Sequence, residues 1–177
     1  ADLVQTLEAE ELADIFWRYG DERESRRIAR ALVRERVMRP IETTSQLADL
    51  VERVCPRRGR QSHPATRVFQ ALRIAVNDEM GALRRGLEGA MELLEPGGRL
   101  AVITFHSLED RVVREFMKSE CREYDLPEGE SEDWPHLRRP RPSRGALVTR
   151  KAQLPTPDEV AANPRARSAQ LRVLEKL

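Results

Sequence analysis

The chain has 177 residues, of which 40% are hydrophobic and 34% are charged, and its formal net charge at pH 7 is +1. This length allows one compact domain or two small lobes, and the near balance of charge excludes a simple basic nucleic-acid tail. The 31 basic residues are 28 arginines and three lysines. Arginine suits phosphate and RNA recognition because its planar fork donates paired hydrogen bonds, although a GC-rich genome would give the same bias.

The two cysteines, Cys55 and Cys121, are far apart and lack C-x-x-C spacing. This argues against a zinc site or a disulfide framework, so we expect no metal. No apolar run approaches the roughly 20 residues that span a bilayer, and the first residues lack the charged and apolar regions of a signal peptide. We therefore expect a soluble, cytoplasmic protein with no membrane partner.

The first part of the chain is predicted to be helical. Apolar residues at helical spacing are followed by a glycine that stops the helix: Leu12, Ile15, Phe16, Tyr19 and Gly20. A second helix is predicted from about 21 to 38, and a third begins after Thr43 or Thr44, either of which can cap it. Because no convincing strand occurs here, residues 1–62 are predicted to form an all-helical lobe.

Residues 63–105 predict two helices and then a strand. The helices run to about 80 and to 94, and a Pro-Gly-Gly turn follows. Residues 100–105 are almost wholly apolar without alternation, which suits a strand buried on both faces of a parallel sheet. A further helix begins directly after residue 105. Helix, turn, strand and helix make one repeat of a doubly wound α/β sheet.

The remainder predicts a long, partly disordered surface loop over about 119–145, followed by two strands at 146–151 and 169–176 with a short helix between them. These two strands could pair as an antiparallel edge on a mostly parallel sheet. About three strands cannot make a stable doubly wound sheet alone. Either partner strands come from elsewhere, or the strand prediction is wrong.

Three motifs in the expected order resemble the MraW-type methyltransferases. They are the segments 63–74 (H-P-A-T-R-V-F-Q-A-L-R-I), 96–100 with 105–111 (P-G-G-R-L and F-H-S-L-E-D-R), and 163–168 (N-P-R-A-R-S). The resemblance covers nearly the whole chain outside 119–145. It implies S-adenosylmethionine-dependent methylation of the N4 amine of a decoding-centre cytosine in 16S ribosomal RNA, with the small ribosomal subunit as partner.

The resemblance also implies the fold class and the division of the chain. The fold would be α/β, namely the C-terminal part of a Rossmann-like class I methyltransferase domain (63–177) plus an all-helical inserted lobe for substrate recognition (1–62). Family members begin with a glycine-rich, strand-following cofactor loop. The only glycine pair here, Gly97-Gly98, precedes a strand instead. We therefore expect no cofactor-binding residues in this chain, S-adenosylmethionine being bound mainly by a missing N-terminal half.

Four polar residues after the predicted strand are the candidate catalytic group: His106, Ser107, Glu109 and Asp110. They would lie at the carboxyl edge of the sheet, where doubly wound folds bind ligands. His106 or Glu109 is predicted near the target base, as hydrogen-bond acceptor or proton relay, because the amine must be held and aimed. Alternatively, Ser107 caps the helix with Asp110 at its third position. That structural role is preferred for Ser107 and Asp110, while for His106 both stay open.

A second group of residues is predicted to contact RNA: His63, Arg67, Gln70, Arg73, Arg165 and Arg167. His63 and Arg67 flank a helix start, where free N–H groups can bind phosphate. The alternatives are that His63-Pro64 caps the helix, that the following polar residues form a solvated face, and that Asn163 merely makes a turn.

Two functions of different classes are therefore expected. The first is a methyltransferase whose activity belongs to the full-length protein, this chain being a fragment that is inactive alone. The second is a non-enzymatic RNA- or ribosome-binding module derived from the same family. A homodimer, or a complementing N-terminal chain, could complete the sheet in either case.

Overall fold

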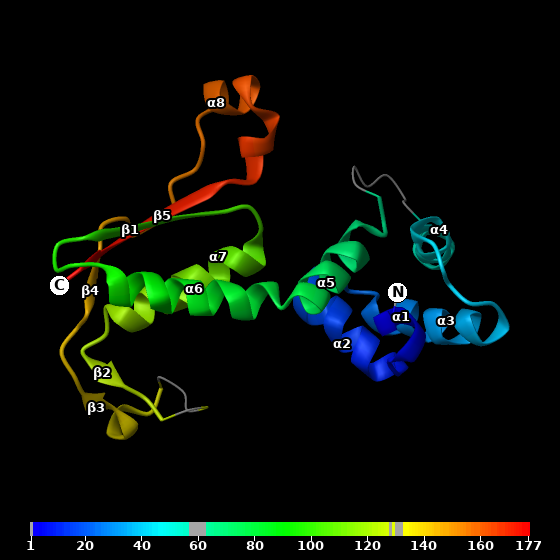
Figure 1. The fold of residues 1–177 in the computed structure, drawn as a ribbon, viewed down its shortest axis with the longest axis horizontal. Coiled ribbons are helices and arrows are strands. Elements are labelled where there is room, and N and C mark those ends of the chain that lie inside the picture. The colour runs from blue at the N-terminus through cyan, green and yellow to red at the C-terminus, as the bar shows by residue number, and fades with distance from the viewer. Residues whose placement is uncertain (1, 57–62, 128, 130–132) are drawn as a thin grey trace. The chain divides into compact units, whose positions relative to one another are not determined.

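The computed structural model describes residues 2–56, 63–127, 129 and 133–177 (Figure 1). It divides into two compact units, unit 1 (Ala1–Glu79) and unit 2 (Met80–Leu177). The expected lobe over 1–62 and the expected loop over 119–145 include residues 57–62, 128 and 130–132, which lie outside the described residues. Each unit is described below by itself.

Unit 1 is helical, as its sequence predicts. Its helices are α1 (Asp2–Thr6), α2 (Ala9–Gly20), α3 (Ser25–Met38), α4 (Thr44–Val54) and α5 (Thr66–Asn77). The apolar stripe of α2 is confirmed, since Leu12 and Phe16 are fully buried. Thr43 is the cap of α4, and its hydroxyl accepts the N–H of Gln46 in a reciprocal capping box. The short helix α1 was not predicted.

The close packing of α2 on α5 depends on Gly20, the last residue of α2. A Cβ atom at Gly20 would lie 2.6 Å from the carbonyl oxygen of Arg67 on α5. Two side chains of α5 reach the same end of α2: Arg67 donates to Asp21 O at 2.9 Å and Gln70 to Tyr19 O at 3.4 Å. They satisfy carbonyl groups that a helix end leaves without partners.

The boundary between the two units differs from the expected domain boundary after residue 62. Because α5 packs against α2, it belongs to unit 1, and the division falls at Glu79. The helix predicted to run to about 80 ends at Asn77, where Asp78 adopts a left-handed conformation (φ 47°). The next helix, α6 (Glu79–Leu93), begins directly after it.

The sheet of unit 2 is antiparallel, contrary to the parallel arrangement predicted for residues 100–105. Its three strands lie in the order β1 (Arg99–Thr104), β5 (Gln170–Lys176) and β4 (Gly145–Leu147). The central strand β5 pairs antiparallel with both neighbours, which confirms the strand predicted at 169–176, whereas the one predicted at 146–151 is shorter and ends at Leu147. The parallel prediction for β1 is wrong within the described residues, because the last strand of the chain runs back along it.

The sheet is covered on one face by α6 and α7 (Ser107–Glu120) (Figure 1). Leu100 and Val102 of β1 pack against the cluster formed by both helices. Ala101 and Ile103 point to the other face and are exposed, Ile103 by 58%. The expectation of burial on both faces is therefore wrong here. An apolar run cannot reveal which of its faces finds a partner. Within the described residues, β1 also has one edge without a neighbouring strand.

The segment over 119–145 is more ordered than the predicted loop. It contains the two-stranded ladder of β2 (Tyr124–Asp125) and β3 (Arg139–Pro140), and the single 3-10 turn η1 (Pro135–Leu137). The guanidinium of Arg138 lies 4.7 Å from the centre of the Tyr124 ring, a cation–π contact that supports the ladder. After β4, the short helix α8 (Pro157–Ala162) is confirmed, and η2 (Pro164–Ser168) leads into β5.

Lys176, at the end of β5, joins the sheet to the end of α6. Its ammonium group donates to three carbonyl oxygens at the C-terminus of that helix, those of Met91, Glu92 and Leu94, at 2.9, 3.3 and 2.7 Å. A cation at this position satisfies carbonyls without helical partners and interacts favourably with the helix dipole.

A second charged contact joins β5 to the start of α7. Both oxygens of the Asp110 carboxylate accept hydrogen bonds from Arg172, at 2.7 and 3.0 Å. The two side chains are only 12% and 13% exposed. Arg172 thus fixes the first turn of α7 against the central strand through a paired geometry that lysine cannot reproduce.

We expect Lys176→Met to weaken the attachment of α6 to the sheet by about 1–2 kcal/mol, because three carbonyls lose a charged donor. The measurement is hydrogen exchange of the amides in β5 and α6, which reports the local free energy of opening. Lys151→Met, at an exposed lysine without a described partner, is the matched control and should leave that exchange unchanged. Equal exchange in both variants would contradict the role of Lys176.

We expect Asp110→Ala and Arg172→Met each to destabilise unit 2 by about 2–4 kcal/mol, since either leaves a largely buried charge without its partner. The double variant should cost less than the sum of the two. A double-mutant cycle measured by urea unfolding gives the coupling energy directly. Additive effects would show that the two groups do not stabilise one another.

Candidate functional site

The strand β1 leads directly into the residues that the sequence singles out. It ends at Thr104, and His106 follows in an extended conformation (φ −143°, ψ 161°) as the N-cap of α7. The chain changes from strand to helix within two residues. This places His106 and Glu109 together at the first turn of α7, beyond the end of β1.

His106 and Glu109 form a reciprocal capping box. The Nδ1 atom of His106 accepts the backbone N–H of Glu109 at 3.2 Å. In return, the Oε2 atom of Glu109 accepts the N–H of Phe105 at 2.8 Å and that of His106 at 3.3 Å. A histidine side chain thus takes the place that serine or threonine usually holds in such a box.

This geometry assigns the proton on the imidazole ring. Because Nδ1 accepts a hydrogen bond, the neutral ring carries its proton on Nε2. Nε2 lies 3.2 Å from the Oε1 atom of Glu109 but makes no hydrogen bond to a described residue, and the atom is buried. The side chains of His106 and Glu109 are 18% and 27% exposed. Oε1 and the N–H of Nε2 are therefore the two polar groups of the box that the capping hydrogen bonds do not use.

Ser107 and Asp110 do not form the predicted cap of α7. The cap is His106, and its partner at the third helical position is Glu109. The prediction that Ser107 caps and Asp110 closes the box is therefore wrong by one residue, because the extended backbone continues through His106. Ser107 is the exposed first residue of α7. Asp110 accepts hydrogen bonds from Arg172, and this pair holds the first turn of α7 against β5.

The predicted RNA contacts in unit 1 make hydrogen bonds inside the unit. His63 accepts the N–H of Ala65 through Nδ1 at 3.1 Å, and its Nε2 lies 3.5 Å from a carboxylate oxygen of Glu52. Arg67 and Gln70 bind the end of α2, as described above. Arg73 makes two hydrogen bonds to Glu79, at 2.8 and 3.1 Å. The capping role expected as an alternative for His63 agrees with this geometry.

Two predicted RNA contacts in unit 2, Arg165 and Arg167, are more available. Both lie on η2 and are exposed, and neither guanidinium has a partner among the residues that the structure describes. Asn163 makes the preceding turn, since its Oδ1 accepts the N–H of Arg165 at 3.2 Å. The turn is therefore structural, and the two arginines remain free to contact a phosphate.

The glycine pair before β1 does not fit a cofactor cradle. The N–H of Gly97 donates to Lys176 O at 2.8 Å, and that of Gly98 donates to Glu95 O at 2.8 Å. The carbonyl of Gly98 accepts the N–H of Lys176. Both glycine N–H groups are thus engaged, whereas a glycine-rich nucleotide loop needs free ones. The Gly97-Gly98 turn therefore does not have the free N–H groups of such a loop.

Metal and thiol chemistry find no support in the described part of the chain. No cluster of three metal-binding side chains occurs there. Burial and the neighbouring Glu120 carboxylate raise the pKa of the Cys121 thiol, which keeps it protonated and a poor nucleophile at neutral pH. None of the described helices is long and apolar enough to cross a bilayer.

Sequence reasoning missed two residues that contact the predicted ones, one in each unit. In unit 2, Arg172 fixes Asp110 in the first turn of α7. Glu52, beside His63, comes from a different helix and carries no motif. A signal for Arg172 existed, because a charged residue in the middle of a predicted apolar strand needs a buried partner.

Comparison with known proteins agrees with this picture. The chain is 54% identical to the "Ribosomal RNA small subunit methyltransferase H" of Paramagnetospirillum magneticum, over 97% of its own length and 54% of that protein's. Proteins of the same name from Rhodospirillum centenum and Thermomicrobium roseum are 52% and 50% identical, over 99% and 100% of the chain and 53% of each protein. The chain thus spans about half the length of these relatives.

The motifs of the sequence lie at defined places in this mixed α/β structure: the start of α5, the passage from β1 to α7, and the turn before β5. A family model described as the MraW methylase family matches residues 1–177. The chain therefore belongs to the MraW methylase family.

Proposed function

We propose that this chain is part of an S-adenosylmethionine-dependent enzyme that methylates the N4 amine of a decoding-centre cytosine in 16S ribosomal RNA. The relatives that it matches are named as methyltransferases of the small-subunit ribosomal RNA. The observation that carries the proposal is the His106–Glu109 box. It leaves an acceptor, Oε1 of Glu109, and a donor, Nε2–H of His106, beside one another at the end of β1. The reaction would take place in the cytoplasm.

The remainder of the methyltransferase domain would come from the part of the protein that the relatives have beyond this chain. Two observations favour this arrangement. The edge of β1 has no neighbouring strand among the described residues, so further strands of a Rossmann-like sheet can add there. The Gly97 and Gly98 N–H groups are engaged, so the cofactor would be held by residues outside the chain. The chain alone would then be inactive. Unit 1 would serve as the helical, substrate-recognising insertion.

The chemistry asks the protein mainly to hold the amine. The lone pair of a cytosine amine is delocalised into the ring, so the amine must be oriented toward the methyl donor and must lose a proton. In this proposal, Oε1 of Glu109 accepts an N–H of the amine and takes its proton when the methyl group is transferred, while the Nε2–H group of His106 donates a hydrogen bond to the base. The bound cofactor supplies the methyl group. Asp110 and Arg172 act as positioning residues, because they fix the turn that carries the other two.

We expect Glu109→Gln and His106→Asn to lower methyl transfer by the intact protein by about 10²–10⁴-fold, the usual contribution of a positioned acid or base. Both variants keep the helix cap, because glutamine can close a capping box and asparagine is a good N-cap. The loss would therefore reflect chemistry and not folding. The measurement is single-turnover methylation of small subunits that lack the modification.

The control is Glu115→Gln, an exposed carboxylate on the same helix, which should transfer the methyl group at the unaltered rate. Should the variants at 106 and 109 match that control, the capping box would be purely structural. Mass spectrometry of the 16S RNA tests the function itself. An intact protein that binds ribosomal RNA but leaves the cytosine amine unmodified would support the non-enzymatic RNA-binding alternative.

A further inference from the structure

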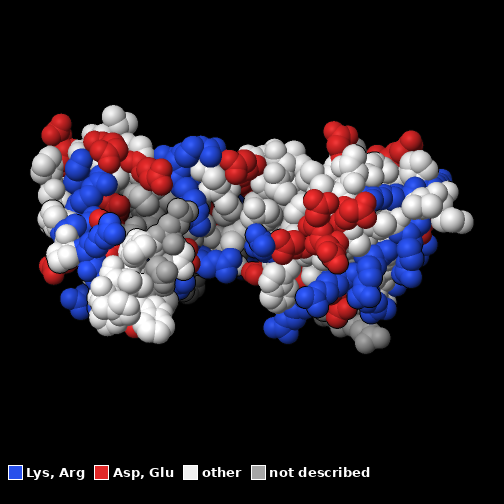
Figure 2. Space-filling model, turned by 90° about the horizontal axis from the view of Figure 1, so that it is seen from below, with Lys and Arg blue, Asp and Glu red and all other residues white. Residues whose placement is uncertain are grey.

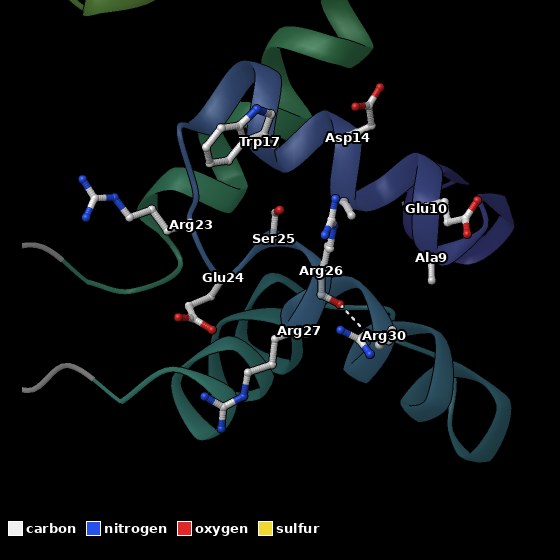
Figure 3. A pocket seen from close by; sticks show the side chains of 11 residues that line it. Ala9, Glu10, Asp14, Trp17, Arg23, Glu24, Ser25, Arg26, Arg27 and Arg30 are labelled. Atoms are coloured by element: carbon white, nitrogen blue, oxygen red, sulfur yellow. Dashed lines mark hydrogen bonds between the residues drawn. The ribbon is translucent and has the colours of Figure 1, made fainter.

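Unit 1 contains a groove of about 970 Å³ that lies between α2 and the start of α3 (Figure 3). It lies wholly within unit 1, and none of the predicted site residues lines it. Its walls carry one tryptophan and four arginines: Trp17, Arg23, Arg26, Arg27 and Arg30. The volume falls in the range of sites that take small organic ligands.

The start of α3 lines this groove, and the buried carboxylate of Glu22 accepts the N–H of Glu24 at 3.0 Å rather than an N–H of the first turn. Glu24, at the N-cap position, makes no side-chain capping hydrogen bond, and the first turn of this 14-residue helix contains no acidic residue. The backbone N–H of Arg26 has no acceptor among the described residues. The free N–H of Arg26 and the positive dipole end of the helix together favour an anion at this position.

Ser25 gives a second, independent indication of a ligand. Its residue is 5% exposed, and its hydroxyl makes no hydrogen bond within the part of the chain that the structure describes. Figure 3 shows this hydroxyl pointing into the groove, toward the side on which Trp17 lies. Because this hydroxyl faces the groove and donates to no described group, a phosphate oxygen bound in the groove could accept its hydrogen bond.

The arginines supply positive charge that the protein does not neutralise. Arg23, Arg26 and Arg27 form no ion pair with any described residue, and Arg30 contacts only the carbonyl oxygen of Arg26, at 3.2 Å. On the surface of unit 1 seen in Figure 2 (right half of the view), basic groups gather in a band and are not evenly mixed with acidic ones.

The acidic residues of the groove do not cancel this charge. The carboxylate of Asp14 is paired with Arg18 at 2.8 Å. The carboxylate of Glu24 points away from Ser25 in Figure 3, and Glu10 lies toward the far end of α2. The region around Ser25 and Arg26 is therefore the part of the groove suited to an anion.

Trp17 completes the groove with an aromatic surface. It lies off the apolar stripe of α2 and is 57% exposed, although a tryptophan of a single compact helical unit is normally buried. Its ring has no cation–π or aromatic partner among the described residues. An exposed aromatic ring beside arginines is the usual surface on which an unpaired base stacks.

We propose that this groove binds one nucleotide of single-stranded RNA, with its phosphate at Ser25 and the start of α3 and its base stacked on Trp17. The inference rests on and deepens the proposed function, since it gives an RNA substrate a contact in unit 1 in addition to the site in unit 2. Charge complementarity selects RNA over an acidic protein segment, because a carboxylate peptide would use the arginines but would leave the tryptophan without a stacking partner.

The test uses the 177-residue chain and a fluorescently labelled ten-nucleotide single-stranded RNA. We expect Trp17→Ala to weaken binding by roughly ten-fold, within the range measured for loss of one base stack, and Trp17→Phe to restore most of it. The variant Arg26→Gln with Arg27→Gln should weaken binding and lower the slope of log affinity against log salt by about 0.7, the value for the loss of one phosphate contact on a single strand. Ser25→Ala should weaken binding without changing that slope.

Two matched controls lie outside the groove. Trp134→Ala removes a tryptophan that is equally exposed, at 55%, and Arg34→Gln removes an exposed arginine from the same helix α3. Both should bind RNA as the unaltered chain does, and circular dichroism confirms that every variant is folded. The proposal is overturned if the substitutions at positions 17, 25, 26 and 27 leave the RNA affinity unchanged. It is also overturned if the control substitutions lower that affinity equally.

The outcome is separable from that of the methylation experiment. If the groove variants bind RNA normally while the intact protein methylates the cytosine, the groove proposal alone fails. If the groove variants lose RNA while the unaltered intact protein leaves the cytosine unmodified, the proposed reaction alone fails. An acidic peptide could instead bind the groove with an affinity that added RNA does not change. That result would assign the surface to a protein partner and would likewise overturn the proposal.

Discussion

Unit 2 depends on the position of its last strand. β5 lies between β1 and β4 and pairs with both, so the sheet exists only once the end of the chain has returned to it. The same strand carries Arg172, which holds the first turn of α7, and Lys176, which holds the last turn of α6. Hydrophobic burial attaches the helices to one face of the sheet, while these two cations determine where each helix begins or ends. A single strand therefore fixes both helices that cover the sheet.

The candidate site combines folding and chemistry in the same two side chains. His106 and Glu109 satisfy backbone groups at the start of α7, and this is why their orientation is determined without a substrate. Each nevertheless keeps one polar atom unused, Nε2 and Oε1. A site built on a helix start is held more firmly than one built on a loop, and the Asp110–Arg172 pair supports it from within the unit. The groove beside Trp17 is similar in one respect, since its polar groups also lie at a helix start, that of α3.

The sequence predicted the elements better than their partners. Helical periodicity located α2, α3 and α4, because spacing reports directly which face of a helix is buried. The Thr43 cap followed from local chemistry for the same reason. Whether β1 has parallel neighbours, or a covered second face, depends on residues far away in the chain, and no local pattern contains that information. The shift of the α7 cap from Ser107 to His106 shows a similar limit, since histidine is not a usual capping residue. Trp17 could have been noticed, as it interrupts the polar face of its helix.

The edge of the sheet at β1 affects how the protein behaves in solution. Along one edge, β1 has no neighbouring strand among the described residues, so its amide and carbonyl groups there have no strand to pair with, and the exposed side chain of Ile103 adds an apolar surface beside them. Such a margin is a template on which strands of other molecules can add, and natural proteins usually bury or charge it. Preparations of this chain by itself will therefore gain colloidal stability from dilution, or from a companion polypeptide that supplies the adjoining strand.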